Sequence, residues 1–398
     1  MIAKYRNFLA RLNRRFEPRR AFGYPQHLQL SPTNACNLRC SNCPKTHYPT
    51  SNQHMPPEVY RQVKEQLFSH VSILDLQGLG EPTMAPLFPQ MLEDGHRHRL
   101  KVKFTTNATL LKPPMIEELV AMAAEVTVSL DGACAETHEA SRPGADFERV
   151  IEALTEFRRA TEKLASSGRR GGFVLNINTV VSVNNLAEIP ELISIAAKCR
   201  AMRLTLINPG VGERTDEFAR AAIGNHPDLL RRQIAQLRQL AQECGVMLIY
   251  PPFFHEAPLM AVAEAPSPDA QQPAAQEKLT DANGFILPNA KRIFPGKCFD
   301  PWQMIYVDVD GWVRFCCRAV NYGMGNVLES SFKEIWHGDH YQRLRTSVNS
   351  NCPPAICRDC VAPWGITHGD EEFCQKLAQR EIRLPEPPLI GVTYSGED

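Results

Sequence analysis

The chain has 398 residues, which is long enough for one large α/β domain and a smaller one. Hydrophobic residues make up 43% of the chain and charged residues 22%, as in an ordinary globular protein. Basic and acidic residues both number 44, so the formal net charge is zero. This balance argues against a nucleic-acid binder that relies on bulk charge.

No stretch of the sequence has the continuous apolar run of a membrane span or of a signal peptide. We therefore expect a cytoplasmic protein without a membrane span. In that reducing compartment, the 13 cysteines are expected to bind metal or take part in redox chemistry rather than to form disulfides.

Residues 1–23 are predicted to form a basic N-terminal helix. Residues 1–22 carry seven basic residues and one acidic residue, Glu17, and apolar side chains recur at roughly helical spacing. Such a helix can cap the domain, or it can contact an anionic partner or a membrane surface.

Strand-like and helical segments alternate through residues 24–252, the expected core domain. The expected strands are 27–31, 72–80, 101–107, 125–132, 172–181, 201–209 and 245–252. The expected helices are 56–68, 113–124, 145–166, 186–199 and 227–244. Repeated β-α units predict parallel strands wrapped by helices, here a partial (β/α)6 TIM-like barrel. Its chemistry would lie at the carboxyl ends of the strands.

The composition changes after the barrel. Residues 253–292 are predicted to be a flexible linker or insertion, because 257–280 hold seven Ala and four Pro. Residues 293–380 are predicted to form a small cysteine-rich α+β domain, with a hairpin that turns at Gly311 and a helix within 323–345. Residues 381–398 are predicted to be a loosely ordered tail.

Three cysteines follow the first expected strand. Cys36, Cys40 and Cys43 have the spacing C-x3-C-x2-C. Three thiolates can hold three irons of a [4Fe–4S] cube and leave the fourth iron open to an outside ligand. A partial zinc site or an accidental spacing are the alternatives.

This motif, on the first loop of a partial barrel, resembles that of the radical S-adenosylmethionine (radical SAM) family. The resemblance covers about residues 27–250. It implies that the open iron binds SAM. An electron from the cluster would then cleave SAM to methionine and a 5′-deoxyadenosyl radical, which abstracts hydrogen from a substrate.

Two further loops resemble SAM-binding motifs of this family. GLGEP (78–82) follows the second strand and implies that Gly80 and Glu81 hold the methionine amino group. A plain strand-end turn is the alternative for the glycines. TTNAT (105–109) implies a role for Asn107, with Ala108 where the family carries glycine.

The fourth and fifth strands supply the remaining predicted SAM contacts. Ser129 and Asp131 end the fourth strand, and a serine and an aspartate suit the hydroxyls of a ribose. Strand alternation places Asn176 and Asn178 on one face, with Asn178 nearer the active end. Asn178 is therefore a candidate SAM contact, and an internally satisfied Asn is the alternative.

A second group of cysteines resembles the SPASM or twitch extension found after many radical SAM barrels. The pattern is C-x12-G-x4-C from Cys298 to Cys316, followed by the C-x2-C pair Cys357 and Cys360. It implies one auxiliary [4Fe–4S] cluster on these four thiolates, and a four-cysteine zinc site is the alternative. Three further cysteines of the C-terminal region are left unassigned, and either of the last two could replace one ligand: Cys317, Cys352 and Cys374.

The resemblance implies a radical SAM oxidoreductase with an electron donor such as flavodoxin or ferredoxin. We expect oxidation of a small molecule such as a sugar, aminocyclitol or nucleoside, because only 35 residues precede Cys36. Modification of a ribosomally made peptide is the alternative, and a non-enzymatic zinc- or cluster-binding interaction protein is an alternative from another class. The fold does not choose among these reactions. No catalytic side chain is assigned and no nucleic-acid partner is expected.

Overall fold

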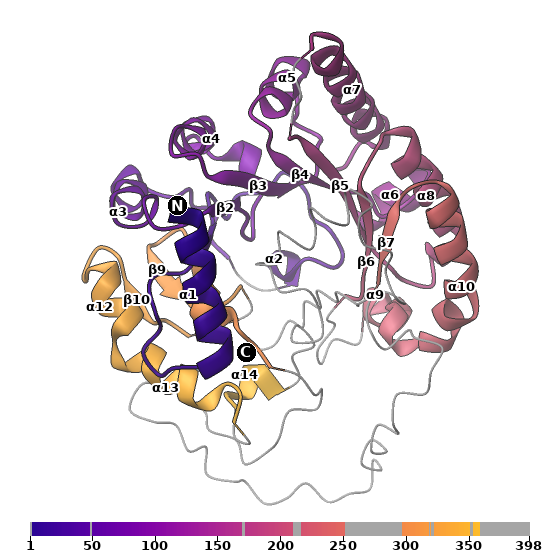
Figure 1. The fold of residues 1–398 in the computed structure, drawn as a ribbon. Helices are drawn as coiled ribbons and strands as arrows, with labels where there is room; N and C mark the ends of the chain where they lie inside the picture. Colours follow the sequence, from indigo (N-terminus) through magenta and orange to yellow (C-terminus); the bar gives the residue numbers. More distant parts are fainter. Residues whose placement is uncertain are drawn as a thin grey trace, which may run out of the picture.

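The computed structural model (Figure 1) describes residues 2–47, 50–168, 172–209, 216–250, 297–317, 319, 322–350 and 353–358. Several sequence predictions lie outside these residues: the linker 253–292, the tail 381–398, and the three cysteines Cys352, Cys360 and Cys374.

The strands and helices of the barrel alternate along the chain. The strands are β1 (His27–Leu30), β2 (Ile73–Leu76), β3 (Lys101–Thr106), β4 (Glu125–Ser129), β5 (Val174–Val180), β6 (Arg203–Ile207) and β7 (Met247–Ile249). The helices of this part are α1 (Ile2–Phe16), α2 (Pro44–His47), α3 (Pro57–Leu67), α4 (Phe88–Arg97), α5 (Pro113–Ala121), α6 (Ala135–Ser141), α7 (Phe147–Ser166), α8 (Ile189–Lys198), α9 (Glu217–Ala221) and α10 (Pro227–Glu243), with short 3₁₀ turns η1 (Pro82–Met84), η2 (Leu186–Glu188) and η3 (Ile223–Asn225).

The C-terminal part is smaller and mixed. Its elements are α11 (Asp300–Gln303), β8 (Met304–Val307), β9 (Trp312–Arg314), β10 (Gly325–Asn326), α12 (Phe332–His337), α13 (Asp339–Ser347) and α14 (Ala355–Arg358).

A single ten-stranded sheet joins both parts of the described chain, in the order β10-β9-β8-β1-β2-β3-β4-β5-β6-β7. Strands β1 to β7 are parallel neighbours in chain order, as expected when a helix connects each strand to the next. Figure 1 shows α3, α4, α5, α7, α8 and α10 on the outer side of the curved sheet. This is the expected α/β architecture of a partial barrel, with β7 as a seventh strand.

The outward face of the strands forms the hydrophobic core with the helices. Leu74, Phe104 and Val126 are fully or almost fully buried, and the ring centroid of Phe104 lies 5.1 Å from that of Phe88 in α4. The inward face of the same strands carries polar and charged side chains, such as Asp75 and Glu125, because successive residues of a strand point to opposite faces.

The predicted hairpin at Gly311 is confirmed. Strands β8 and β9 pair antiparallel, with Tyr306 opposite Arg314, and Gly311 has φ of +85° in the turn. Strand β8 also pairs parallel with β1, so the hairpin extends the barrel sheet. The single helix expected within 323–345 is wrong: it is divided into α12 and α13, because Gly338 between them has an extended backbone.

In the part of the chain that the structure describes, no helix is both long enough and apolar enough to cross a membrane.

Candidate active site

The cysteine loop begins directly after β1, at the carboxyl edge of the parallel strands. Cys40 is buried, whereas Cys36 and Cys43 are half-buried. The loop is held by its own backbone, since the Cys43 amide donates to the carbonyl of Cys40 over 3.1 Å. The Leu38 amide approaches Sγ of Cys36 at 3.4 Å. The three predicted cluster ligands therefore lie on one short, partly sheltered loop.

The environment of these thiols fits ligands of a cluster. Burial raises the pKa of Cys36, and it raises the pKa of Cys40 to about 11, although Arg142 opposes the second shift. The thiols also lie near enough for Cys43 to raise the pKa of both others. Three thiolates crowded in this way need a compensating positive charge, and bound iron supplies one.

No three Cys, His, Asp or Glu side chains of the described residues converge on a position for a single metal ion. An iron–sulfur cube differs from such a site, because each of its thiolates binds a different iron. The loop of Cys36, Cys40 and Cys43 thus fits the cluster proposal in its chemistry and burial.

The GLGEP loop packs closely against the start of the cysteine loop. A Cβ atom on Gly80 would lie 2.4 Å from the Ala35 carbonyl oxygen and 2.5 Å from that of Thr33. A Cβ on Gly78 would lie 1.9 Å from Oγ of Ser31. A Cβ atom would thus meet the backbone of the cysteine loop at Gly80 and the Ser31 side chain at Gly78, and the contact of Gly80 with SAM stays a prediction. Gly80 and Glu81 donate their amides to Thr33 and Ala35 over 3.1 and 2.8 Å.

The Glu81 carboxylate is buried and is the centre of a hydrogen-bond network. It accepts bonds from Oγ1 of Thr83 and of Thr106, both at 2.7 Å, and from the Asn107 amide at 2.8 Å. Burial raises the pKa of Glu81 despite these bonds. The carboxylate thus joins the loops after β2 and β3, and its contact with SAM stays a prediction.

Asn107 links the third strand to the cysteine loop. Its side-chain amide donates to Oδ1 of Asn37 over 2.9 Å, and Asn37 donates to Oγ1 of Thr109 over 2.9 Å. Ala108 has φ of +62°, the left-handed conformation for which the family's usual glycine is suited. Asn37 was not predicted as a site residue, and its position between Cys36 and Cys40 was its one signal in the sequence.

Asp131 lies fully buried beyond β4 in an ion pair. Its Oδ2 lies 2.8 Å from Nε of Arg142, and its Oδ1 accepts the Val180 amide over 2.8 Å. Ser141 donates to the same carboxylate over 3.1 Å. A ribose hydroxyl would have to share this carboxylate with three protein donors. The observed contacts give Asp131 a structural role, and its contact with a ribose stays a prediction.

Arg142 is a site residue that sequence analysis missed. Its guanidinium lies 3.7 Å from Sγ of Cys40 while it pairs with Asp131. Burial alone would lower the pKa of Arg142, but Asp131 and Cys40 together raise it above its ordinary value. Arg142 therefore remains charged and joins the cysteine loop to the end of β4.

The other two predicted SAM contacts face each other across neighbouring strands. Ser129 at the end of β4 is paired in register with Asn178 of β5. Asn178 is half-buried, whereas Asn176 is fully buried two residues earlier. The structure thus brings Ser129 and Asn178 together at the active end of the barrel, and their role in SAM binding stays a prediction.

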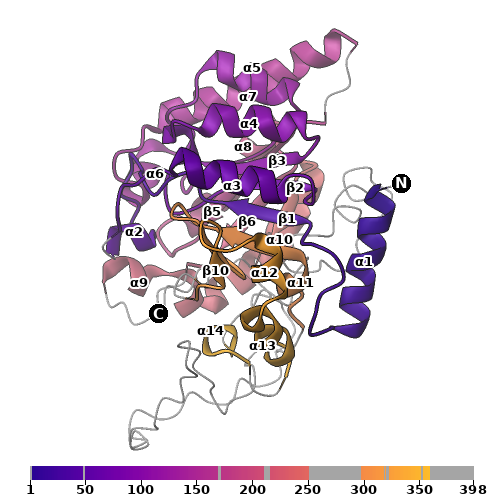
Figure 2. The same cartoon turned by 90° about the vertical axis from the view of Figure 1, so that its left-hand side faces the viewer.

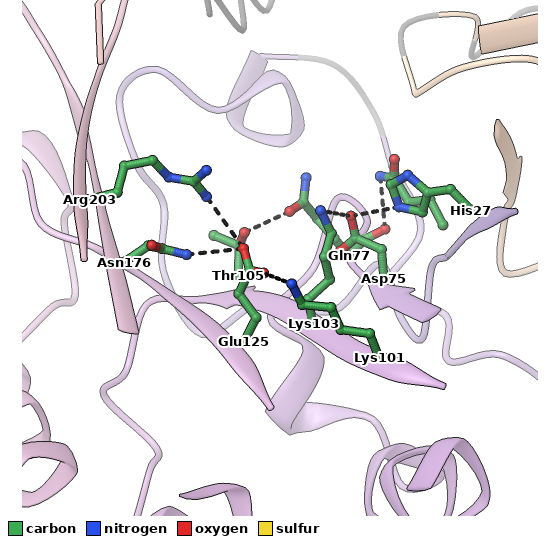
Figure 3. Close-up of polar contacts among 10 residues, drawn as sticks. His27, Asp75, Gln77, Lys101, Lys103, Thr105, Glu125, Asn176 and Arg203 are labelled. Carbon is green, nitrogen blue, oxygen red and sulfur yellow. Dashed lines mark hydrogen bonds and ion pairs between the residues drawn. The ribbon is translucent and has the colours of Figure 1, made fainter. Parts of the chain in front are cut away.

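The interior of the barrel is strongly polar (Figure 3). The Asp75 carboxylate lies 3.3 Å from Nε2 of His27 and 3.5 Å from Nζ of Lys103. Thr105 donates to Gln77 over 2.6 Å on the same side of the interior. Burial lowers the pKa of His27, although its hydrogen bond with Asp75 opposes the shift, so the ring is neutral at neutral pH.

Glu125 is the centre of the second half of this network (Figure 3). Its carboxylate lies 2.9 Å from Nζ of Lys101 and 3.4 Å from Arg203, and it accepts a 3.1 Å bond from Asn176. Burial alone would raise the pKa of Glu125, but Lys103, Lys101 and Arg203 hold it below its ordinary value. The three cations are only partly buried, and the interior that they line is polar. Sequence analysis assigned this network no role, although alternating polar residues in the strands were its signal.

Three of the four predicted auxiliary ligands lie in the described C-terminal part: Cys298, Cys316 and Cys357. Cys298 precedes α11, and Asn349 fixes it by accepting its amide over 2.8 Å and donating to its carbonyl over 3.0 Å. Cys316 follows β9, and Cys357 lies buried in α14. The fourth predicted ligand, Cys360, lies outside the described residues, so the ligand set stays a prediction.

Two protein-family models match the chain. The model of the radical SAM superfamily matches residues 30–194, and the SPASM model, described as an iron–sulfur cluster-binding domain, matches residues 298–361. The two matched ranges include Cys36, Cys40 and Cys43 in the first case and all four predicted auxiliary ligands in the second.

Among the curated relatives is a mycofactocin maturase of Mycobacterium tuberculosis, 32% identical over 260 residues. The match spans 63% of this chain and 60% of the maturase. An AdoMet-dependent heme synthase of Methanosarcina barkeri is 27% identical over 369 residues, which are 88% of this chain and 96% of the synthase.

Solved structures with a similar fold include SuiB of Streptococcus suis bound to S-adenosylmethionine, with a TM-score of 0.57 at 17% identity, covering 89% of this chain and 76% of SuiB. The native structure titled anSMEcpe with bound AdoMet has a TM-score of 0.56 at 18% identity, covering 80% of this chain and 82% of that one. At such low identity these matches support the fold alone.

Proposed function

The chain belongs to the radical SAM superfamily and carries a SPASM-type iron–sulfur cluster-binding domain, and we propose that it modifies a ribosomally made peptide by hydrogen abstraction. The cofactors of this class are SAM, a [4Fe–4S] cluster in the barrel and auxiliary iron–sulfur clusters in the SPASM domain. When bound, SAM and the barrel cluster supply a 5′-deoxyadenosyl radical. The observation that carries the proposal is the three-thiol loop at the carboxyl edge of the barrel.

The residues of this chain divide into ligands, SAM contacts and positioning groups. Cys36, Cys40 and Cys43 would hold three irons and leave one for SAM. The proposed SAM contacts are residues at or near the ends of the second to fifth strands: Gly80, Glu81, Asn107, Ser129, Asp131 and Asn178. Asn37 and Arg142 position the cysteine loop against these strand ends through their contacts with Asn107 and Cys40.

The relatives favour a peptide substrate over the small molecule that was expected from the short segment before Cys36. The maturase shows the higher identity of the two curated relatives described above.

A small molecule is the second candidate, and the heme synthase supports it. The match covers 96% of the synthase and 88% of this chain, so it includes residues of both the barrel and the C-terminal part. A small molecule would be modified at the same carboxyl edge of the barrel. The two candidates therefore differ in substrate size rather than in the reacting site.

We propose that the C-terminal module holds one auxiliary cluster on Cys298, Cys316, Cys357 and Cys360. Hydrogen abstraction followed by loss of one electron and one proton is a two-electron oxidation. The cluster that these four cysteines would hold would supply a one-electron acceptor, and flavodoxin or ferredoxin would exchange electrons with the protein. The pairing of β8 with β1 supports this role because it places the hairpin before Cys316 on the barrel sheet.

The test is formation of 5′-deoxyadenosine from SAM by anaerobically reconstituted protein with dithionite. We expect the triple variant Cys36→Ala/Cys40→Ala/Cys43→Ala to lose this activity and to retain about four irons. Cys134→Ala removes an exposed thiol that belongs to neither predicted ligand set, and it should retain full activity. A folded triple variant without iron would contradict the auxiliary cluster. Wild-type protein that binds SAM and a full cluster complement, yet never cleaves SAM, would contradict the radical mechanism.

The substrate is tested with short peptides encoded by neighbouring reading frames. We expect one of them to stimulate SAM cleavage and to lose a pair of hydrogen atoms by mass spectrometry. Stimulation by a small molecule and by no peptide would reject the peptide proposal in favour of the second candidate.

A further inference from the structure

Helix α1 presents a stripe of large apolar side chains to solvent. Tyr5, Phe8 and Phe16 are 62%, 54% and 64% exposed, and Leu12 between them is half-buried. Their spacing of three or four residues places them on one face of the helix. Single exposed apolar residues are common, but a continuous aromatic stripe indicates a surface that is covered by something.

The opposite face of α1 fixes the helix on the protein. Arg6 donates to the Val71 carbonyl over 2.9 Å, and Gln26 donates to the Arg6 carbonyl over 3.0 Å. Asn13 both donates to the Phe22 carbonyl and accepts its amide, over 3.0 and 2.8 Å. These contacts hold α1 in a defined orientation at the margin of the molecule (Figure 2), so the aromatic stripe points outward in the folded protein.

The charge around the stripe is positive and local. Arg11 and Arg15 are exposed and lie beside Phe8 on the helix surface, and the Arg15 guanidinium lies 5.9 Å from the Phe16 ring centroid. The one acidic residue of this segment, Glu17, pairs with Lys297. Residues 1–22 carry seven basic residues and one acidic residue, so this segment is basic although the whole chain has zero net charge.

We infer that α1 docks the protein on an anionic lipid surface. An aromatic and leucine stripe bordered by arginines is the pattern of a helix that lies in the headgroup plane, with its apolar face in the acyl boundary and its cations at the phosphates. A surface that covers the stripe also meets the two exposed arginines that border it, Arg11 and Arg15. Charge complementarity therefore favours anionic lipid as the occupant.

The position of α1 leaves the candidate active site accessible during docking. Arg6 contacts residues 26 and 71, which precede β1 and β2, whereas the cysteine loop follows β1. The helix and the thiols thus lie at opposite ends of the parallel strands. Docking through α1 would direct the cysteine loop away from the lipid, and it does not depend on the proposed reaction.

The first experiment is co-sedimentation of the full chain with vesicles. We expect binding to phosphatidylcholine vesicles that contain phosphatidylserine to exceed binding to pure phosphatidylcholine vesicles at least about tenfold, and to fall as salt is added. The double variant Phe8→Ser/Phe16→Ser should lose about tenfold or more. Its matched control, Leu229→Ser/Leu328→Ser, changes two exposed leucines on other elements and should bind like wild type.

The second experiment tests the charge. Arg11→Glu/Arg15→Glu should weaken binding to the anionic vesicles by more than about tenfold, since each basic residue near such a surface strengthens binding about fivefold. Arg149→Glu/Arg159→Glu makes the same change in net charge on α7 and should have little effect.

Circular dichroism and iron content confirm that each variant is folded. Equal binding by wild type and Phe8→Ser/Phe16→Ser would overturn the inference, as would the absence of any wild-type binding to anionic vesicles. Self-association without lipid that Phe8→Ser/Phe16→Ser abolishes would assign the stripe to a second copy of the chain instead. SAM cleavage should be unchanged in these variants, which separates this inference from the proposed function.

Discussion

The ion pair between Asp131 and Arg142 should contribute strongly to stability. The Asp131 carboxylate is fully buried, and Nε of Arg142 lies 2.8 Å from it. Arg142→Met would leave a buried carboxylate without its counter-ion, which typically costs about 3–5 kcal/mol. For a domain of this size, that corresponds to a fall of roughly 6–20 °C in Tm. Arg142→Met should also lower iron content, because the guanidinium lies 3.7 Å from Sγ of Cys40.

The assay is urea unfolding of the apoprotein under anaerobic conditions, followed by circular dichroism. Arg149→Met is the matched control, because Arg149 forms an exposed ion pair with Asp146, and it should cost less than about 1 kcal/mol. The double variant Asp131→Asn/Arg142→Met should recover part of the loss, since it removes the uncompensated charge. A cost for Arg142→Met as small as that of the control would refute the reasoning.

Three further changes test other parts of the structure. Gly80→Ala should cost at least about 2 kcal/mol and weaken SAM binding, because its Cβ would lie 2.4 Å from the Ala35 carbonyl oxygen; unchanged affinity by calorimetry would contradict this. Glu125→Gln should cost about 2–4 kcal/mol at neutral pH. Because the pKa of Glu125 is held below its ordinary value, the cost should shrink as the pH falls below 4.5, and a pH-independent cost would be inconsistent. Gly311→Ala should cost about 1–2 kcal/mol, because Gly311 has a positive φ and the new Cβ would approach Asn326. The cost should exceed that of Gly168→Ala, whose Cβ would meet no neighbour, and denaturant titration compares the two.

Local sequence patterns predicted the barrel well, because each pattern reports a short-range preference. Alternating apolar residues marked the strands that became β1 to β7, and proline and helical periodicity marked α3 and α10. Helix α4 was not predicted, although Phe88 and Met91 on it pack fully buried against the strands. Helical periodicity over 323–345 also failed at Gly338, where the extended backbone of one residue divides the helix.

The linear sequence was enough to predict the chemical class of the site. The spacing of Cys36, Cys40 and Cys43 is a property of eight consecutive residues, and so is their place directly after a strand. The glycines of the GLGEP loop were recognisable for the same reason. A ligand loop of this kind is local, so its pattern survives in the linear chain.

The contacts that hold these loops form only in the folded protein. Arg142 contacts Asp131 nearby in the chain, but it also contacts Cys40 about a hundred residues away. Asn37 contacts Asn107 across seventy residues. The parallel pairing of β8 with β1, which joins the two halves of the protein, spans an even longer separation. Such contacts depend on which strands are neighbours and on the register between them, and no local periodicity encodes either.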